Sequence, residues 1–128
     1  MKRIWTNGCF DVLHLGHIEL FKYAISLGGI LTVGIDSDKR VRELKGENRP
    51  INNEKSRKEM LLSIRWVDNV IVFDDELELS DSIFKHADTI VVGSDYKNKT
   101  VIGSEWAKVV FFDKIEGYST TKIIERNQ

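Results

Sequence analysis

Short apolar runs alternate with longer amphipathic segments along this chain, and the alternation predicts its secondary structure. A short run rich in β-branched side chains is typical of a strand that is buried on both faces of a sheet. Apolar residues that recur every three or four positions are typical of a helix that packs against such a sheet. Five runs have the character of strands: residues 4–7, 30–35, 67–73, 89–93 and 109–112.

The segments between these runs have helical spacing. The first of them, residues 16–27, places its apolar side chains on one face and precedes Gly28 and Gly29, which end a helix. Asparagine or serine side chains that cap helix N-termini stand at the start of three other segments. The further predicted helices cover residues 53–66, Ser80 to Ala87, 104–107, and a last segment from Ser119 to near the C-terminus.

Strands and helices that alternate in this way predict an α/β fold, a Rossmann-like three-layer sandwich with a five-stranded parallel sheet. Ligands of such folds bind beyond the carboxyl ends of the strands, where the strand order reverses. Polar segments that follow strands therefore mark candidate sites. The segment 73–76 (FDDE) is an exception, because a solvated turn accounts for it. The other segments are residues 7–17, 36–50, 93–99 and 113–121.

The composition narrows the possible functions. With 128 residues, of which 41% are hydrophobic and 30% charged, the chain has the size and balance of one globular domain over residues 1–128. A formal net charge of −1 provides no basic surface for nucleic acid, and no apolar run is long enough to span a membrane. The N-terminus does not resemble a signal peptide, and the single cysteine, Cys9, excludes an internal disulfide. We therefore expect a cytoplasmic protein that binds neither nucleic acid nor membranes.

Residues 7–17, NGCFDVLHLGH, carry the most distinctive pattern of the chain. Gly8 allows a sharp turn and the close approach of a ligand, and Gly16 has no Cβ to cover the unpaired N–H groups of the following helix. If the first helical turn includes both histidines, His14 and His17 share one face. Each imidazole donates a ring N–H to an oxyanion. Two histidines at a helix N-terminus therefore predict a phosphate site.

Three other interpretations of this motif are open. The histidines can be satisfied structural residues at the start of a helix, although that leaves the neighbouring carboxylate and glycines unexplained. Asp11, His14 and His17 are of the types that bind metals, but the sequence shows no fourth ligand. Cys9 is a candidate nucleophile, but it stands among apolar neighbours at a strand end, where small buried cysteines are common.

Together, the residues Thr6-x-Gly8-x-Phe10-Asp11-x-x-His14-x-Gly16-His17 resemble the HxGH signature of the cytidylyltransferase-like nucleotidyltransferases. A second segment, Glu116-Gly117-x-Ser119-Thr120-Thr121, resembles the motif usually seen in that family as RTEGIST, and it stands before the last predicted helix. Arg57 and Gly93-x-Asp95 also match. The resemblance spans nearly the whole chain, and two motifs in the expected order make it specific.

The resemblance implies an enzyme that transfers a nucleotidyl group from a nucleoside triphosphate to a phosphorylated sugar or polyol and releases pyrophosphate. The attacking phosphate oxygen is already anionic, so catalysis consists of positioning and charge stabilisation rather than base catalysis. The implied catalytic residues are His14, His17, Lys45, Ser119 and Thr120. The implied nucleotide-binding residues are Gly8, Cys9, Phe10, Asp11, His14, Gly16, His17, Arg57, Gly93, Asp95, Lys114, Gly117, Ser119 and Thr120.

In these roles the histidines would hold the phosphates, Lys45 would pair with a phosphate of either substrate, and Ser119 and Thr120 would donate to the leaving phosphates. A magnesium ion bound with the nucleotide is the implied cofactor, and Asp11 would help to place it. Plainer interpretations remain open: Lys45 and Arg49 are also explained by a solvated loop, and Ser119 by a helix cap.

Within the family, residues 44–52, 93–97 and 103–104 look most like the adenylyltransferases that act on heptose 1-phosphate, which implies ATP as the nucleotide and ADP-heptose as the product. Glycerol-3-phosphate cytidylyltransferases, which use CTP, share the segment EGYSTTK but normally have Arg and Thr where this chain has Lys114 and Ile115. An alternative of another class is a nucleotide-binding sensor without turnover. The family also implies a homodimer, with the aromatic side chains Trp66 and Trp106 as candidates for its contact.

Overall fold

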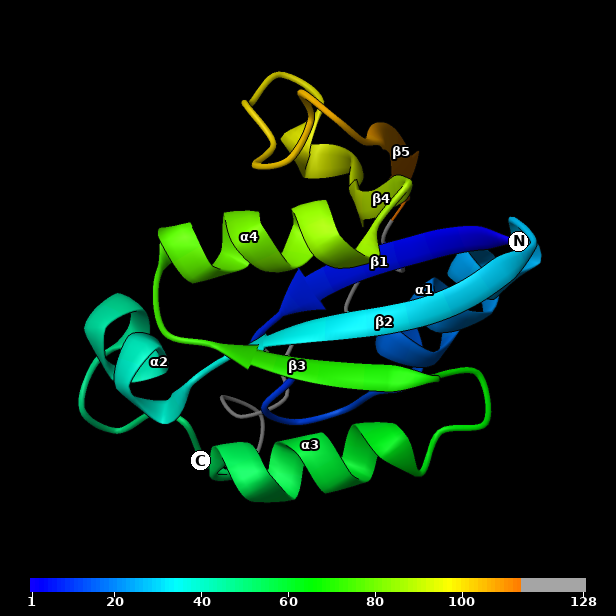
Figure 1. Ribbon diagram of the computed structural model, residues 1–128. Coiled ribbons are helices and arrows are strands. Elements are labelled where there is room, and N and C mark those ends of the chain that lie inside the picture. Colours follow the sequence, from blue (N-terminus) through cyan, green and yellow to red (C-terminus); the bar gives the residue numbers. More distant parts are fainter. Residues whose placement is uncertain (114–128) are drawn as a thin grey trace.

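The structure, a computed structural model, describes residues 1–113, which form one parallel sheet with helices on both faces (Figure 1). All five predicted strands are present, each within two residues of its predicted bounds. The strands are β1 (Lys2–Gly8), β2 (Gly29–Asp36), β3 (Asn69–Phe73), β4 (Thr89–Gly93) and β5 (Lys108–Phe112). The helices are α1 (Leu15–Ser26), α2 (Asp38–Lys45), α3 (Glu54–Leu62), α4 (Glu76–His86) and the 3₁₀ helix η1 (Ser94–Tyr96).

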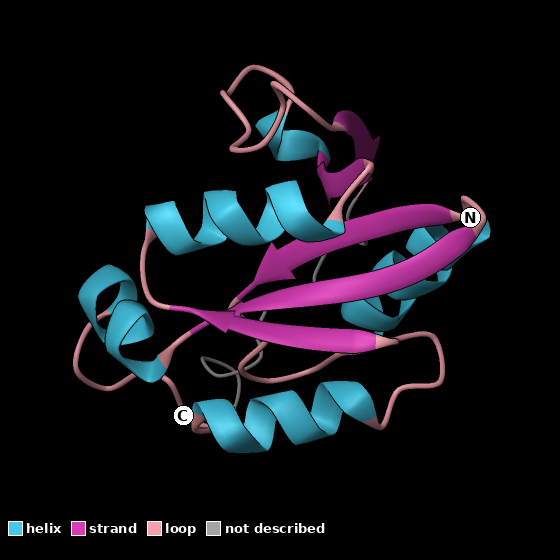
Figure 2. Ribbon diagram, viewed as in Figure 1, coloured by secondary structure: helices cyan, strands magenta, loops and turns pink. Residues whose placement is uncertain are grey.

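The strands pair in the order β3-β2-β1-β4-β5, and every pairing is parallel (Figure 2). The chain builds the sheet outward from β1 on one side and then crosses over to add β4 and β5 on the other. The strand order thus reverses between β1 and β4. The predicted Rossmann-like α/β fold with a five-stranded parallel sheet is confirmed.

Neighbouring residues of β1 face two different helical layers. Ile4 packs in a core with Phe21 of α1 and Leu61 of α3, whereas Trp5 packs in a second core with Ile83 of α4. Because successive strand residues point to opposite faces, α1 and α3 cover one face of the sheet and α4 covers the other (Figure 1). This arrangement gives the three layers.

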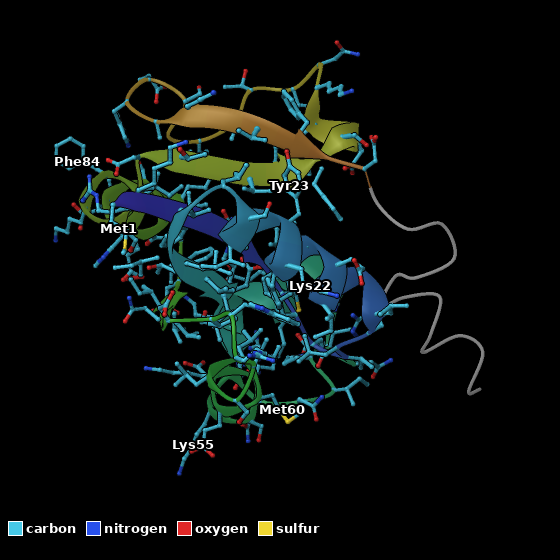
Figure 3. All side chains as sticks on the ribbon, turned by 90° about the vertical axis from the view of Figure 1, so that its right-hand side faces the viewer. Met1, Lys22, Tyr23, Lys55, Met60 and Phe84 are labelled. Carbon is cyan, nitrogen blue, oxygen red and sulfur yellow. The ribbon has the colours of Figure 1, made fainter. Side chains whose placement is uncertain are left out.

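One close contact lies within the sheet, and another joins helix α1 to it. A Cβ on Gly34 of β2 would stand 2.3 Å from Cζ2 of Trp5, so only glycine leaves room for the buried indole at this position. On the other face, the ring of Tyr23 on α1 packs against the ring of Phe112 on β5, with centroids 5.3 Å apart. Tyr23 is labelled in Figure 3. Helix α1 therefore reaches from the central strand to the outer strand β5.

The helices differ from the predictions more than the strands do. Helix α2 lies inside the polar segment 36–50. Val41 is the one buried residue of this short helix, so the sequence shows no helical repeat of apolar positions there. Its N-cap is Ser37, whose side chain accepts the Arg40 N–H at 3.2 Å. Capping chemistry and propensity, not an amphipathic pattern, therefore mark this helix in the sequence.

Three other helix predictions were wrong in their bounds or in kind. The cap of α4 is Asp75, which accepts the Glu78 N–H at 2.8 Å, so the predicted start at Ser80 was too late. Helix α3 ends at Leu62 instead of continuing to residue 66. Residues 104–107 form turns and no helix.

Part of the prediction lies outside the described residues. This part comprises the last predicted helix and the site residues Lys114, Gly117, Ser119 and Thr120. Within residues 1–113, no helix has the length and the apolar character needed to cross a membrane.

Candidate active site

The edge of the sheet at which β1 and β4 end carries the histidine motif. β1 ends at Gly8 and β4 ends at Gly93, on the two neighbouring strands between which the order reverses. Residues 9–14 lead directly from β1 to α1, and Asp95 lies in η1, directly after β4. The predicted residues of both segments thus lie where ligands of this fold class bind.

A tight turn after β1 positions the histidines. Phe10 has a left-handed backbone conformation, with φ of 48°, and is only 6% exposed. Its ring packs edge-on against the imidazole of His17, with centroids 5.1 Å apart. A Cβ on Gly8 would lie 3.3 Å from two carbons of the Phe10 ring, so a glycine at this position leaves room for the ring. Packing therefore holds an unfavourable backbone conformation that brings α1 up to the end of β1.

His14 and His17 cap α1 with their own side chains. His14 is the N-cap residue, and its Nδ1 accepts the Gly16 N–H at 3.1 Å. In return, Nδ1 of His17 accepts the His14 N–H at 3.2 Å. The two rings stack, with centroids 3.8 Å apart and planes inclined by 25°. The pair thus has a structural role, because it bonds backbone N–H groups that the start of a helix leaves unpaired.

The capping bonds also determine which ring nitrogens carry protons. A nitrogen that accepts an N–H is itself unprotonated, so both imidazoles are neutral and have their proton on Nε2. Burial lowers the pKa of His14 below its ordinary value, which favours the same neutral form. The first turn of α1 therefore carries two Nε2–H donors rather than two positive charges. Donors of this kind suit the oxygens of a phosphate.

The alternative of a transition-metal site has no support in this geometry. Within residues 1–113, no group of three or more His, Cys, Asp or Glu side chains is placed to hold an ion. Nδ1 of each histidine already accepts a backbone N–H, and Nε2 is the protonated nitrogen. The unprotonated nitrogen of each ring is thus occupied by a backbone N–H, so neither ring offers an unoccupied lone pair to a metal ion.

Asp11 anchors the loop that follows α2. Its side chain is fully buried, and its two carboxylate oxygens accept the backbone N–H groups of Ile51 and Asn52, each at 2.7 Å. Nε of Arg49 lies 3.2 Å from Oδ2 and completes an ion pair. A carboxylate with both oxygens bonded and no exposed surface does not fit the role of a magnesium ligand. The metal role predicted for Asp11 therefore has no support in these contacts.

Arg57 joins four segments behind the histidine turn. It is 1% exposed, and its donors point at protein groups. They bond the carbonyl oxygens of Cys9 (2.9 Å), Asp36 (2.7 Å) and Asn52 (3.0 Å), and the Asp38 carboxylate (2.8 Å). These bonds tie the ends of β1 and β2 to the starts of α2 and α3. These bonds give Arg57 a structural role, and the predicted contact with a nucleotide has no support among them.

The positive charge of Lys45, the last residue of α2, acts on the thiol of Cys9, which directly follows β1. Burial raises the pKa of the Cys9 thiol, and the positive charges of Lys45 and Arg57 oppose this shift only in part. A thiol with a raised pKa is protonated at neutral pH, which makes Cys9 a weak nucleophile. Lys45 is an exposed residue in the last turn of α2, not in an irregular loop as predicted. Its charge therefore lies near the turn after β1.

Arg49 is the site residue whose position the sequence did not reveal. Its only predicted features were those of a polar loop, whereas the structure packs it against Asp11, 38 positions earlier in the chain. No local pattern signals a contact across that separation. The peptide bond that follows Arg49, to Pro50, is cis.

Known proteins resemble this chain over almost its full length. The family model described as Cytidylyltransferase-like matches residues 5–126. The proteins named Bifunctional protein HldE from Campylobacter jejuni subsp. doylei and from Helicobacter pylori are 46% and 47% identical over 126 residues. Both matches cover 98% of this chain but only 27% of the relative, so the chain spans about a quarter of the length of these relatives.

Solved structures share the fold. The lipopolysaccharide core biosynthesis protein from Thermoplasma volcanium superposes with a TM-score of 0.75 at 28% identity, over 91% of this chain and 99% of that protein. A bifunctional NMN adenylyltransferase/ADP ribose pyrophosphatase from Francisella tularensis superposes with a TM-score of 0.71 at 19% identity. That match covers 98% of this chain and 42% of the other protein, and it concerns the fold alone.

Proposed function

The chain belongs to the cytidylyltransferase-like family of nucleotidyltransferases, and from this premise we propose that it transfers the adenylyl group of ATP to heptose 1-phosphate. An oxygen of the heptose phosphate forms a bond to the α-phosphorus of ATP. The bond from that phosphorus to the bridging oxygen breaks, and pyrophosphate leaves. The products are ADP-heptose and pyrophosphate.

The observation that carries this proposal is the reciprocal cap formed by His14 and His17. It holds two neutral imidazoles with their protons on Nε2, in the first turn of a helix at the edge where the strand order reverses. The donors are fixed before substrate arrives, so no reorganisation is needed when charge develops on the transferring phosphate. The helix N-terminus adds a favourable field for the same anion.

The other residues of the site have complementary roles in the proposal. The tight turn from Gly8 to Phe10 sets the position of the nucleotide through the backbone, and the exposed Lys45 pairs with a substrate phosphate. We assign Ser119 and Thr120 to the leaving phosphates, on the strength of the family motif. The acceptor phosphate is already anionic, so the site needs no general base.

We propose that magnesium enters with the triphosphate of ATP. When bound, the ion offsets phosphate charge and helps to align the leaving group. Within residues 1–113 no acidic cluster is placed to hold it, and the Asp11 carboxylate is bonded to backbone N–H groups. The phosphate oxygens therefore supply its main ligands, which is common for this ion.

The choice of ATP and a heptose phosphate rests on the sequence. Residues 44–52 and 93–97 resemble the heptose 1-phosphate branch, and Lys114 and Ile115 depart from the glycerol-3-phosphate branch. The relative from Thermoplasma volcanium carries a name that refers to lipopolysaccharide core biosynthesis, which agrees with a sugar phosphate as acceptor.

We also propose that the chain acts as a cytoplasmic homodimer, which light scattering at micromolar concentration tests.

A matrix of substrates tests the proposed reaction. Each of ATP, CTP, GTP and UTP is combined with heptose 1-phosphate or glycerol 3-phosphate and magnesium, and pyrophosphate release is measured. We expect turnover with ATP and heptose 1-phosphate. Faster turnover with CTP and glycerol 3-phosphate would assign the chain to the cytidylyl branch. Nucleotide binding without pyrophosphate release in any combination would identify a sensor.

A further inference from the structure

Two arginines lie close behind the histidine turn, and their surroundings differ. Arg57 is completely buried and bonds three carbonyl oxygens and the Asp38 carboxylate. The side chain of Arg49 is 13% exposed, and its one hydrogen bond in the described part of the chain runs from Nε to Asp11. Its Nη2 is the one buried side-chain nitrogen or oxygen in that part without a hydrogen-bond partner.

A buried guanidinium nitrogen without a partner is unfavourable. Removal from water costs free energy that only a hydrogen bond returns, so nearly all such groups in folded proteins are bonded. The side chain cannot easily turn away, because its ion pair with Asp11 fixes it on the Nε side. Nη2 is therefore a donor for which residues 1–113 supply no acceptor.

The remaining donors of Arg49 have the geometry of an oxyanion receptor. With Nε directed at Asp11, the edge formed by Nη1 and Nη2 is left with parallel N–H groups. Such a fork matches two oxygens of a phosphate and forms charge-assisted bonds to both. Lysine offers only a point charge in the same place.

The location of Arg49 matches the proposed reaction. Asp11 lies between the end of β1 and His14, so the Arg49–Asp11 pair brings the guanidinium to the same turn as the histidine cap. The charge of Lys45 also lies near this turn, because it acts on the Cys9 thiol. Two cations from one polar segment thus meet the edge at which phosphates are expected.

We propose that Arg49 binds a phosphate oxyanion of a substrate through Nη1 and Nη2, while Asp11 holds its Nε. This inference rests on the proposed function for the source of the phosphate. Both the acceptor and the nucleotide carry that chemistry. An effect on the KM of only one substrate identifies which of them Arg49 binds.

The decisive variant is Arg49→Lys, compared with Arg49→Ala and with the control Arg65→Lys. Lysine can keep an ion pair with Asp11 but cannot form the fork. Arg65 is exposed and stacks on Trp66 before β3, at the opposite edge of the sheet. Its replacement by lysine therefore controls for the effect of an arginine-to-lysine change away from the site. Melting temperatures show whether each variant is folded.

We expect Arg49→Lys to raise the KM of one substrate by roughly 10- to 100-fold, with a melting temperature close to that of the unchanged protein. Arg49→Ala should show at least the same rise, and Arg65→Lys should show none. Unchanged KM values for both substrates in Arg49→Lys would overturn the proposal, because they would show that Arg49 serves only to hold Asp11.

A binding experiment separates this inference from the proposed reaction. If no substrate pair releases pyrophosphate, the proposed function fails, but calorimetric titration with inorganic pyrophosphate and with inorganic phosphate still tests Arg49. Pyrophosphate stands for the nucleotide phosphates, and inorganic phosphate stands for the acceptor phosphate. We expect Arg49→Lys to weaken the binding of at least one of these anions tenfold or more and Arg65→Lys to leave both unchanged. Equal binding of both anions by the unchanged protein and Arg49→Lys, or no binding of either by the unchanged protein, would contradict the inference.

Discussion

Two neighbouring groups of polar residues at the carboxyl edge of the sheet use their hydrogen bonds in opposite ways. The anchor network, Asp11 and Arg57 with the groups they bond, is buried and directed inward at backbone N–H and carbonyl groups. The histidine cap, His14 and His17, bonds the backbone through Nδ1 and so has its protons on Nε2. All four residues match motifs of one family, yet we expect only the cap to meet a phosphate.

This difference shows that a family motif mixes two kinds of residue. Some members hold the backbone of the turn after β1, and in our proposal others act on the substrate from that turn. Substitutions should separate them, because loss of an anchor lowers stability and loss of a cap donor lowers turnover. The following predictions start with the largest expected effect.

Replacement of Arg57 by alanine should have the largest effect on stability. It leaves the Asp38 carboxylate and three carbonyl oxygens without their donor, and loss of one partner of a buried ion pair costs about 3–5 kcal/mol. Urea unfolding measures the change, with Lys58→Ala as the control at the next, exposed position of α3. A loss below about 1 kcal/mol would show that Arg57 is not an anchor.

Replacement of Asp11 by asparagine should have a smaller effect. Both oxygens accept backbone N–H groups, so either orientation of the amide sets its NH2 against another N–H. We expect a loss of about 1–3 kcal/mol and faster hydrogen exchange at the amides of Ile51 and Asn52. Exchange that stays as slow as in the unchanged protein would contradict the anchoring role.

The neutral state of the His14 cap should make stability depend on pH, and we expect this effect to be smaller than those of the two substitutions above. Burial lowers the pKa of folded His14 below its unfolded value, so the unfolded chain binds more protons just below that value. The contribution of His14 to stability is therefore complete above the unfolded pKa, about 6.5, and is lost as the pH falls toward the lower folded pKa. Melting temperatures from pH 8 to pH 5 should fall less in His14→Asn than in the unchanged protein. Identical slopes would contradict neutral capping.

The sequence predicts the parts of this molecule whose cause is local. Runs such as 89–93 are apolar on both faces and predict strands, and His14 and His17 are close in sequence, so their shared helical turn is expected. Helix α2 escapes prediction because it buries almost no apolar surface. The bonds from Asp11 to the N–H groups of Ile51 and Asn52 connect residues 40 and 41 positions apart, and no periodic pattern reports such contacts.

The roles of Asp11 and Arg57 illustrate the same limit. A carboxylate and an arginine within nucleotide-binding motifs favour contacts with magnesium and phosphate. Only the fold shows that Asp11 is bonded by Ile51 and Asn52, and that Arg57 faces the carbonyl oxygens at the ends of β1 and β2. Residue type indicates possible chemistry, whereas the bonds that a buried side chain already makes decide whether it is available to a substrate.

The variant His14→Asn tests most directly the claim that the histidine cap acts on the substrate. Asparagine is among the best N-cap residues, so it can replace the Nδ1 bond to the start of α1, but it has no donor at the place of Nε2. We predict an almost unchanged melting temperature and a turnover with ATP and heptose 1-phosphate that is lower by roughly 100- to 1000-fold. Turnover close to that of the unchanged protein, in a variant of equal stability, would show that His14 only caps the helix and would contradict the account.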